Sequence, residues 1–259
     1  MRFNGSPLNH FAADLATLGL FPTVRSVLKF GQCSDTDGLA DVWNGGASGG
    51  GVYTGIPNAS ADTLDVVSSS PNDDPASTGA WTVLLEGLDD DFNEIIELVT
   101  LDGTNPVTTV QAFRRMNRAR VITTGSGGFN AGEITARHTS TGANVFMVMP
   151  ANRNQTHIAA YTVPAGWRGI IKSVSMSLQR DAGGTFDREA SIDVLVREEV
   201  GGPLRSKFPR TITTSDDLDS HFASGIVVPE KGDLVARVWS VSNANSVVSA
   251  EIEVRLFRM

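Results

Sequence analysis

The chain has one cysteine, two tyrosines and four lysines among its 259 residues. The single thiol, Cys33, excludes an internal disulfide and any thiolate metal cage built within one chain. We expect it to be a small, half-buried side chain. No apolar run is long enough to span a membrane, because the stretch from Phe11 to Phe21 is short and contains Asp14. The sequence therefore predicts a soluble protein made in a cytoplasm.

Positive charge is missing from one long stretch of the chain. Residues 30–113 contain fourteen acidic residues and no lysine, arginine or histidine, and four arginines follow within the next seven positions. The net charge is +2 for residues 1–29, −14 for 30–113 and +4 for 114–259, which sums to −8. Segregated charge concerns partners and solubility rather than fold. We expect the arginines to bind the acidic stretch, within the chain or in a neighbouring subunit.

One short helix is predicted near the N-terminus. Phe11, Leu15 and Leu18 recur at helical spacing, and a glycine and a proline follow as a stop. So short a helix is not stable alone in water, so we expect residues 1–45 to form an arm that docks on a neighbour or packs across the body. Residues 46–80 are acidic and rich in turn residues, and we expect only short edge strands there.

From Trp81 onward the pattern is that of β-strands. In the final strand Ile252, Val254 and Leu256 alternate with polar residues, as a strand with one wet face requires. Strands of this kind without intervening helices predict an all-β fold. We expect an antiparallel β-sandwich of jelly-roll type over residues 81–259, with the N-terminal arm extending from it.

Two further details of the β-pattern can be checked against a structure. Asp193 and Arg197 alternate with apolar residues, so we expect them on the wet face of their strand. The segment Tyr161–Gly169, with its Pro-Ala-Gly turn, is expected to be a corner that joins two sheets.

Residues Asp89, Asp91 and Asn93 imitate the start of a calcium-binding loop. Glu94 stands where that loop needs glycine, and Thr100 stands where a bidentate glutamate belongs. We therefore interpret these residues as an acidic hairpin tip, with a non-standard Ca²⁺ site as the alternative. No other metal site and no cofactor is expected.

Two patterns raise the question of catalysis. Ser48 lies in a Gly-Ala-Ser-Gly-Gly stretch that matches a nucleophile elbow, but the strand and helix that an elbow needs are missing. Glu94 and Glu97 resemble the carboxylate pair of a glycosidase, but nothing places them across a cleft. We expect no catalytic residues, and a hydrolase using Ser48 or this pair is the enzyme alternative.

Several motifs together point to a known family. They are Trp81-Thr82-Val83, Glu86-Gly87-Leu88-Asp89, Phe92-Asn93-Glu94, the run from Glu97 to Val107, Asn154-Gln155-Thr156, Tyr161-Thr162-Val163-Pro164-Ala165-Gly166 and the alternating C-terminal strands. With these motifs the sequence resembles accessory virion structural proteins of tailed bacteriophages. The similarity extends over about residues 24–259, and its motifs are structural. The resemblance implies a β-rich, multimeric component of a virus particle. Capsid decoration, a neck or tail collar and a fibre base are all compatible with it.

These observations predict a non-enzymatic virion protein that binds neighbouring virion subunits as a homo-oligomer, with a trimer favoured. The alternative is a carbohydrate- or receptor-binding module of a tail appendage, with Ca²⁺ as a possible aid. A pI near 5.0 argues against nucleic-acid binding. The predicted interface residues are Phe11, Leu15, Leu18, Arg114, Arg118 and Arg120.

Overall fold

The computed structural model describes residues 23–34, 39–45, 51–56, 60–180, 188–214, 217–243 and 246–259. These residues form strands, turns and loops, with no helix among them. The all-β prediction is therefore confirmed for this part of the chain. The predicted helix with Phe11, Leu15 and Leu18 lies outside the described residues, as does Ser48.

The described strands pair in an antiparallel manner and form four sheets. Their bounds are β1 Val24–Ser34, β2 Ala40–Asp41, β3 Leu64–Ser68, β4 Ala80–Leu88, β5 Glu94–Thr100, β6 Val107–Thr108, β7 Arg115–Thr124, β8 Ile134–His138, β9 Val145–Met149, β10 Ala160–Thr162, β11 Trp167–Arg180, β12 Glu189–Arg197, β13 Arg205–Thr213, β14 Leu218–Val228, β15 Asp233–Val241 and β16 Ser246–Arg258.

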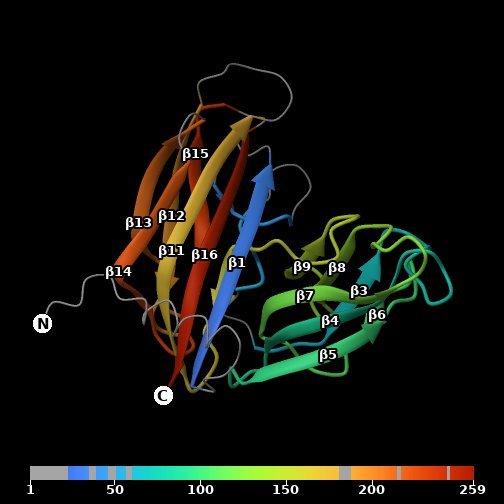
Figure 1. Cartoon of the computed structure of the whole chain (residues 1–259). Helices are drawn as coiled ribbons and strands as arrows, with labels where there is room; N and C mark the ends of the chain where they lie inside the picture. The colour runs from blue at the N-terminus through green and yellow to red at the C-terminus, as the bar shows by residue number, and fades with distance from the viewer. Residues whose placement is uncertain are drawn as a thin grey trace, which may run out of the picture.

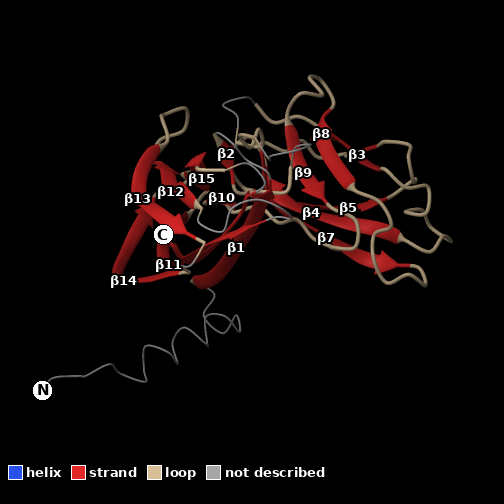
Figure 2. Ribbon diagram, turned by 90° about the horizontal axis from the view of Figure 1, so that it is seen from above, coloured by secondary structure: helices blue, strands red, loops and turns tan. Residues whose placement is uncertain are grey.

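The sheets are grouped in two lobes that meet at one junction (Figures 1 and 2). The first, which we call the core unit, packs the sheet β1-β16-β11-β14 against the sheet β10-β15-β12-β13, to which β2 also belongs. The second, which we call the inserted unit, lies within residues 51–156 and packs β6-β3-β8-β9 against β5-β4-β7. Each unit has its own hydrophobic core.

Early strands of the core unit pair with late ones. β1 pairs with β16, β10 with β15, β11 with β14, and β12 with β13. The C-terminal strand β16 lies between β1 and β11, and the predicted alternation places Ile252, Val254 and Leu256 in the core. The first and last strands of the described chain are thus hydrogen-bonded to each other.

The inserted unit interrupts a single edge position of the core unit. β2 and β10 both pair with the edge of β15 that faces away from β12, with Asp41 opposite Arg237 and Ala160 opposite Val235. The chain that leaves β2 and the chain that returns to β10 also pair with each other, through a bridge between Trp43 and Ile158. Because its two ends lie side by side, this unit could be inserted without disturbing the sheet.

The structure divides the chain differently from the domains predicted by sequence. β1 is a full strand of the core unit rather than part of an arm, and the predicted single sandwich over 81–259 is shared between two units. The alternation of polar and apolar residues shows that a strand has a buried face. It does not show which sheet covers that face, and so the boundary was missed.

The predicted wet face of β12 is also wrong, because the inserted unit covers it. Asp193 and Arg197 are buried, and Leu195 on the same face packs in a cluster with Val148 of the inserted unit. The predicted corner at Tyr161–Gly169 is confirmed, since β10 and β11 lie in different sheets. Gly166 in this corner has a φ of 74°, a backbone conformation that favours glycine.

Candidate functional site

The junction of the two units is the most elaborate part of the described structure. Its centre is an apolar cluster that includes Trp43, Tyr53, Val148, Leu195 and Val235, all nearly inaccessible to solvent. The Tyr53 hydroxyl donates a hydrogen bond to the backbone oxygen of Phe146 at 2.8 Å. Apolar burial of this kind fixes two sheets against each other and favours one relative orientation of the units.

A buried charge cluster lies beside the apolar one. Asp233 at the start of β15 accepts hydrogen bonds from Arg115 Nε at 3.0 Å and from Arg197 Nη1 at 3.1 Å. The side chains of Asp233 and Arg115 are 1% and 2% exposed, and that of Arg197 is 11% exposed. Thr162 donates a further hydrogen bond to the same carboxylate. Because Arg115 belongs to the inserted unit, this carboxylate couples the two units in a low-dielectric site.

A second ion pair ties the entrance of the inserted unit to the core unit. Arg237 Nε lies 2.6 Å from Asp41 Oδ1, and the backbone N–H of Tyr53 donates to Asp41 Oδ2 at 2.8 Å. Burial raises the pKa of Asp41, and the hydrogen bond from Arg237 works against this rise.

The two units are also joined by a side chain of β7. Asn117 exchanges two hydrogen bonds, each 3.0 Å long, with the backbone of Thr162 in the core unit.

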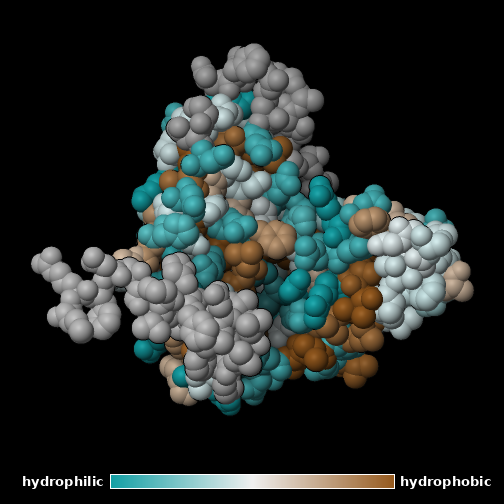
Figure 3. Space-filling model, in the orientation of Figure 1, coloured by the Kyte–Doolittle hydropathy of each residue, from teal (hydrophilic) through white to brown (hydrophobic). Residues whose placement is uncertain are grey.

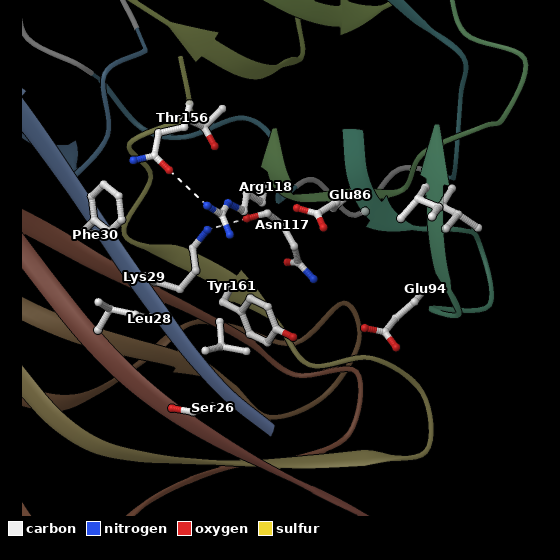
Figure 4. Close-up of a pocket in the computed structure, with 15 residues that line it drawn as sticks. Ser26, Leu28, Lys29, Phe30, Glu86, Glu94, Asn117, Arg118, Thr156 and Tyr161 are labelled. Atoms are coloured by element: carbon white, nitrogen blue, oxygen red, sulfur yellow. Dashed lines mark hydrogen bonds between the residues drawn. The ribbon is translucent and has the colours of Figure 1, made fainter. Parts of the chain in front are cut away.

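A cleft of about 450 Å³ opens on the same junction, between β1 of the core unit and the strands β4, β5 and β7 of the inserted unit (Figure 4). Its lips are apolar, because Leu28 and Ile96 are 52% and 63% exposed. Its inner wall is polar and carries the buried Lys29, with the exposed Arg118 beside it. At one end, Arg25 Nη1 donates to both carboxylate oxygens of Glu94, at 2.7 and 2.8 Å.

Lys29 is the unusual group in this cleft. Its side chain is buried, and its ammonium group donates to the backbone oxygen of Asn117. The pKa of Lys29 is lowered to about 7, mainly by burial and also by the positive charge of Arg118, whereas the charge of Glu86 acts to raise it. Arg118 donates to the neutral amide of Gln155 at 3.1 Å. The inner wall therefore places two cationic side chains together without a carboxylate bonded to either among the described residues.

The space-filling view shows how the surface changes from the junction to the far end (Figure 3). Hydrophobic surface gathers over β4 and β5, where Ile96 and Leu98 are exposed. The end of the inserted unit away from the core unit is mostly white, which marks residues of intermediate hydropathy. Its loops are held by Asp73, a buried carboxylate that accepts hydrogen bonds from the backbone N–H groups of Ala80, Ala131 and Gly132.

Two of the three predicted interface arginines form ion pairs with the acidic stretch of the same chain. Arg114 lies 2.9 Å from Asp90, and Arg120 lies 3.6 Å from Glu86. Arg118 lines the junction cleft. Arg114 and Arg120 thus form ion pairs with acidic residues of their own chain, as the charge pattern predicted, whereas Arg118 does not. Contact of these residues with a neighbouring subunit stays a prediction.

The calcium-loop residues form a hairpin turn. Asp89 Oδ1 accepts the backbone N–H groups of Asp91 and Asn93, at 2.9 and 2.8 Å, and the Asn93 amide donates to Asp89 Oδ2. This carboxylate stabilises the turn between β4 and β5. Within the described residues no group of three or more His, Cys, Asp or Glu side chains is placed to hold a metal ion.

Glu94 and Glu97 do not form a pair. They are three positions apart on β5 and so lie on opposite faces of the strand. Glu97 accepts the backbone N–H groups of Val110 and Gln111, both at 2.8 Å, whereas Glu94 pairs with Arg25. Each carboxylate therefore has a separate structural partner.

Sequence reasoning missed the junction residues. Lys29 could have been found, since it is in phase with Val27 and Cys33 on the inward face of β1. Asp233 gave no comparable signal, because its partners Arg115 and Arg197 lie 118 and 36 residues away in the chain.

Comparison with known proteins adds little. No family model matches the chain, and no curated protein is similar enough to match it. Solved structures that match include infectious bursal disease virus strain Gx, with 10% identity, a TM-score of 0.22 and coverage of 91% of this chain and 76% of that one. Another is the VP2 subviral particle of that virus, with 10% identity, a TM-score of 0.15 and coverage of 92% and 77%. Scores this low carry no argument about function. Among the described residues, no helix is long and apolar enough to cross a membrane.

Proposed function

We propose that the protein is a non-enzymatic structural subunit of a virus particle, built on a jelly roll that carries an inserted second β-sandwich. The observation that carries the proposal is the strand pairing of the core unit. With β2 and β10 counted as one edge position, the core unit has eight strand positions, and the first pairs with the eighth, the second with the seventh, the third with the sixth and the fourth with the fifth. A ribbon of antiparallel pairs rolled up in this way is a jelly roll, the architecture of many capsid and lectin domains.

The attachment of the inserted unit supports a structural role. Apolar packing around Trp43 and Leu195 and the buried carboxylate of Asp233 hold the two units in one orientation. A particle made of repeated subunits needs such fixed geometry, because each contact recurs in every copy. The resemblance of the sequence to accessory virion proteins of tailed bacteriophages points the same way. Capsid decoration and a neck or tail position remain the alternatives within this proposal.

The experiment is to produce the full chain alone and to determine its assembly state. Analytical ultracentrifugation and negative-stain imaging should show closed oligomers or larger regular assemblies, with a trimer as the expected building block. In parallel, mass spectrometry of purified virions from the source should detect the chain in a fixed ratio to other structural proteins. A monomer at all concentrations, together with absence from mature virions, would sink the proposal.

Binding of a glycan or receptor by the inserted unit is the second candidate. It is favoured by the loops at the far end, whose backbone Asp73 holds in place, since carbohydrate binding needs fixed polar groups. A glycan array measured with and without a chelator tests it. An assembly subunit should bind no sugar under either condition, and loss of binding with chelator would indicate Ca²⁺.

A further inference from the structure

The junction cleft has a polar inner wall, which offers hydrogen-bond donors and positive charge, and apolar side chains at its mouth. Lys29 has three N–H donors, and the backbone oxygen of Asn117 is its single hydrogen-bond partner among the described residues. Figure 4 shows the Lys29 ammonium group and the Arg118 guanidinium group close together on the inner wall. Leu28 and Ile96 expose apolar surface at the mouth.

The acidic groups around Lys29 are already engaged. Glu86 of β4 pairs with Arg120, and Glu94 of β5 pairs with Arg25 at the end of the cleft. Tyr161 of β10 is buried, and burial raises the pKa of its hydroxyl, so that it stays neutral. An anion placed between Lys29 and Arg118 would therefore reduce the repulsion between them, which the nearby charge of Glu86 offsets only in part.

We propose that this cleft binds a small carboxylate with a short apolar body, the carboxylate lying between Lys29 and Arg118 and the body against Leu28 and Ile96. A volume of about 450 Å³ is in the range of small-molecule sites. Guanidinium and ammonium groups form charge-assisted hydrogen bonds with a carboxylate. The apolar lips select against a bare anion, which would leave them in water.

The probe is sodium hexanoate, added to the full chain at pH 6 and followed by calorimetry and saturation-transfer NMR. A ligand of this size in a half-open cleft should bind with a Kd on the order of 1 mM, and at least roughly tenfold more tightly than acetate, which lacks the apolar body. Hexylamine, with the same body and the opposite charge, should not compete. Equal binding of hexylamine, or no binding of hexanoate up to about 50 mM, would overturn the proposal.

Binding should also depend on the proton of Lys29. Raising the pH from 6 to 8 takes Lys29 from mostly charged to mostly neutral, so the affinity for hexanoate should fall about tenfold. The charged groups that line the cleft with Lys29 are Glu86 of β4, Glu94 of β5 and Arg118 of β7. An affinity that is the same at both values would contradict the role of Lys29.

Three variants locate the site. Lys29→Met keeps the length of the side chain and removes the charge, so it should fold and bind hexanoate at least about tenfold more weakly. Lys172→Met is the matched control, because Lys172 also donates to backbone oxygens but lies outside the cleft, and its affinity should not change. Arg118→Gln, at an exposed position, gives a second test if Lys29→Met does not fold. Unchanged affinity in Lys29→Met or Arg118→Gln would refute the assignment, whereas assembly of these variants tests the proposed function separately.

Discussion

The buried carboxylate of Asp233 gives the sharpest stability prediction. Asp233→Asn keeps the shape of the side chain but removes the negative charge that faces Arg115 and Arg197, so two guanidinium groups lose their buried counter-ion. Removing one partner from a buried ion pair costs about 3–5 kcal/mol. For a chain of this length that loss lowers the melting temperature on the order of 10 °C.

The matched control is Glu94→Gln. The ion pair between Glu94 and Arg25 also joins the two units, but its side chains are 44% and 49% exposed. Exposed pairs contribute about 0–1 kcal/mol, because water screens the charges. Urea unfolding followed by tryptophan fluorescence should therefore separate the two variants by at least about 2 kcal/mol. If Asp233→Asn costs no more than Glu94→Gln, the carboxylate does not couple the units as described.

Three further predictions concern the cores and the pH. Asp73→Ala leaves three backbone N–H groups without their acceptor, so it should lower the free energy of unfolding by about 3 kcal/mol and speed hydrogen exchange at residues 131–132. The control Asp74→Ala should do neither. Equal exchange rates in the two variants would contradict the role of Asp73. Ile252 is fully buried in the middle of β16, and Ile252→Ala should lower the free energy of unfolding by about 2–5 kcal/mol. Phe257 is 37% exposed, and Phe257→Ala should lower it by less than about 1 kcal/mol. Urea titration measures both. The pKa of Lys29 is lower in the folded protein than in the unfolded chain, so between about pH 7 and 10 Lys29 carries its proton in the unfolded chain but not in the folded protein. The contribution of Lys29 to the free energy of unfolding therefore rises with pH in this range. The difference between wild type and Lys29→Met should change in favour of wild type by roughly 1.4 kcal/mol per pH unit, and a constant difference would refute the shift.

Strand content could be read from the sequence because alternation is a local property. Ile252, Val254 and Leu256 were correctly placed on one buried face of the final strand. The division into two units could not be read, because it depends on which sheet covers each face. Thus Arg197 has the alternation of a wet-face residue, but it is buried beside Leu195, where the inserted unit packs on β12.

The charge pattern was informative in part. The base-free stretch ends at Arg114, and the structure shows why: β7 carries the arginines back to the junction, where Arg115 meets Asp233. The sequence predicted that these arginines would meet acidic groups. It could not show that Asp233 is one of them, because the two residues are 118 positions apart and only the fold brings them together.

Reconstruction of the assembled particle by cryo-electron microscopy tests the central claim most directly. The account predicts that neighbouring core units adjoin in a repeated layer and that each inserted unit stands off from that layer in one fixed orientation. Absence of the chain from the particle, or a map in which the inserted unit takes a different orientation in each copy, would contradict it.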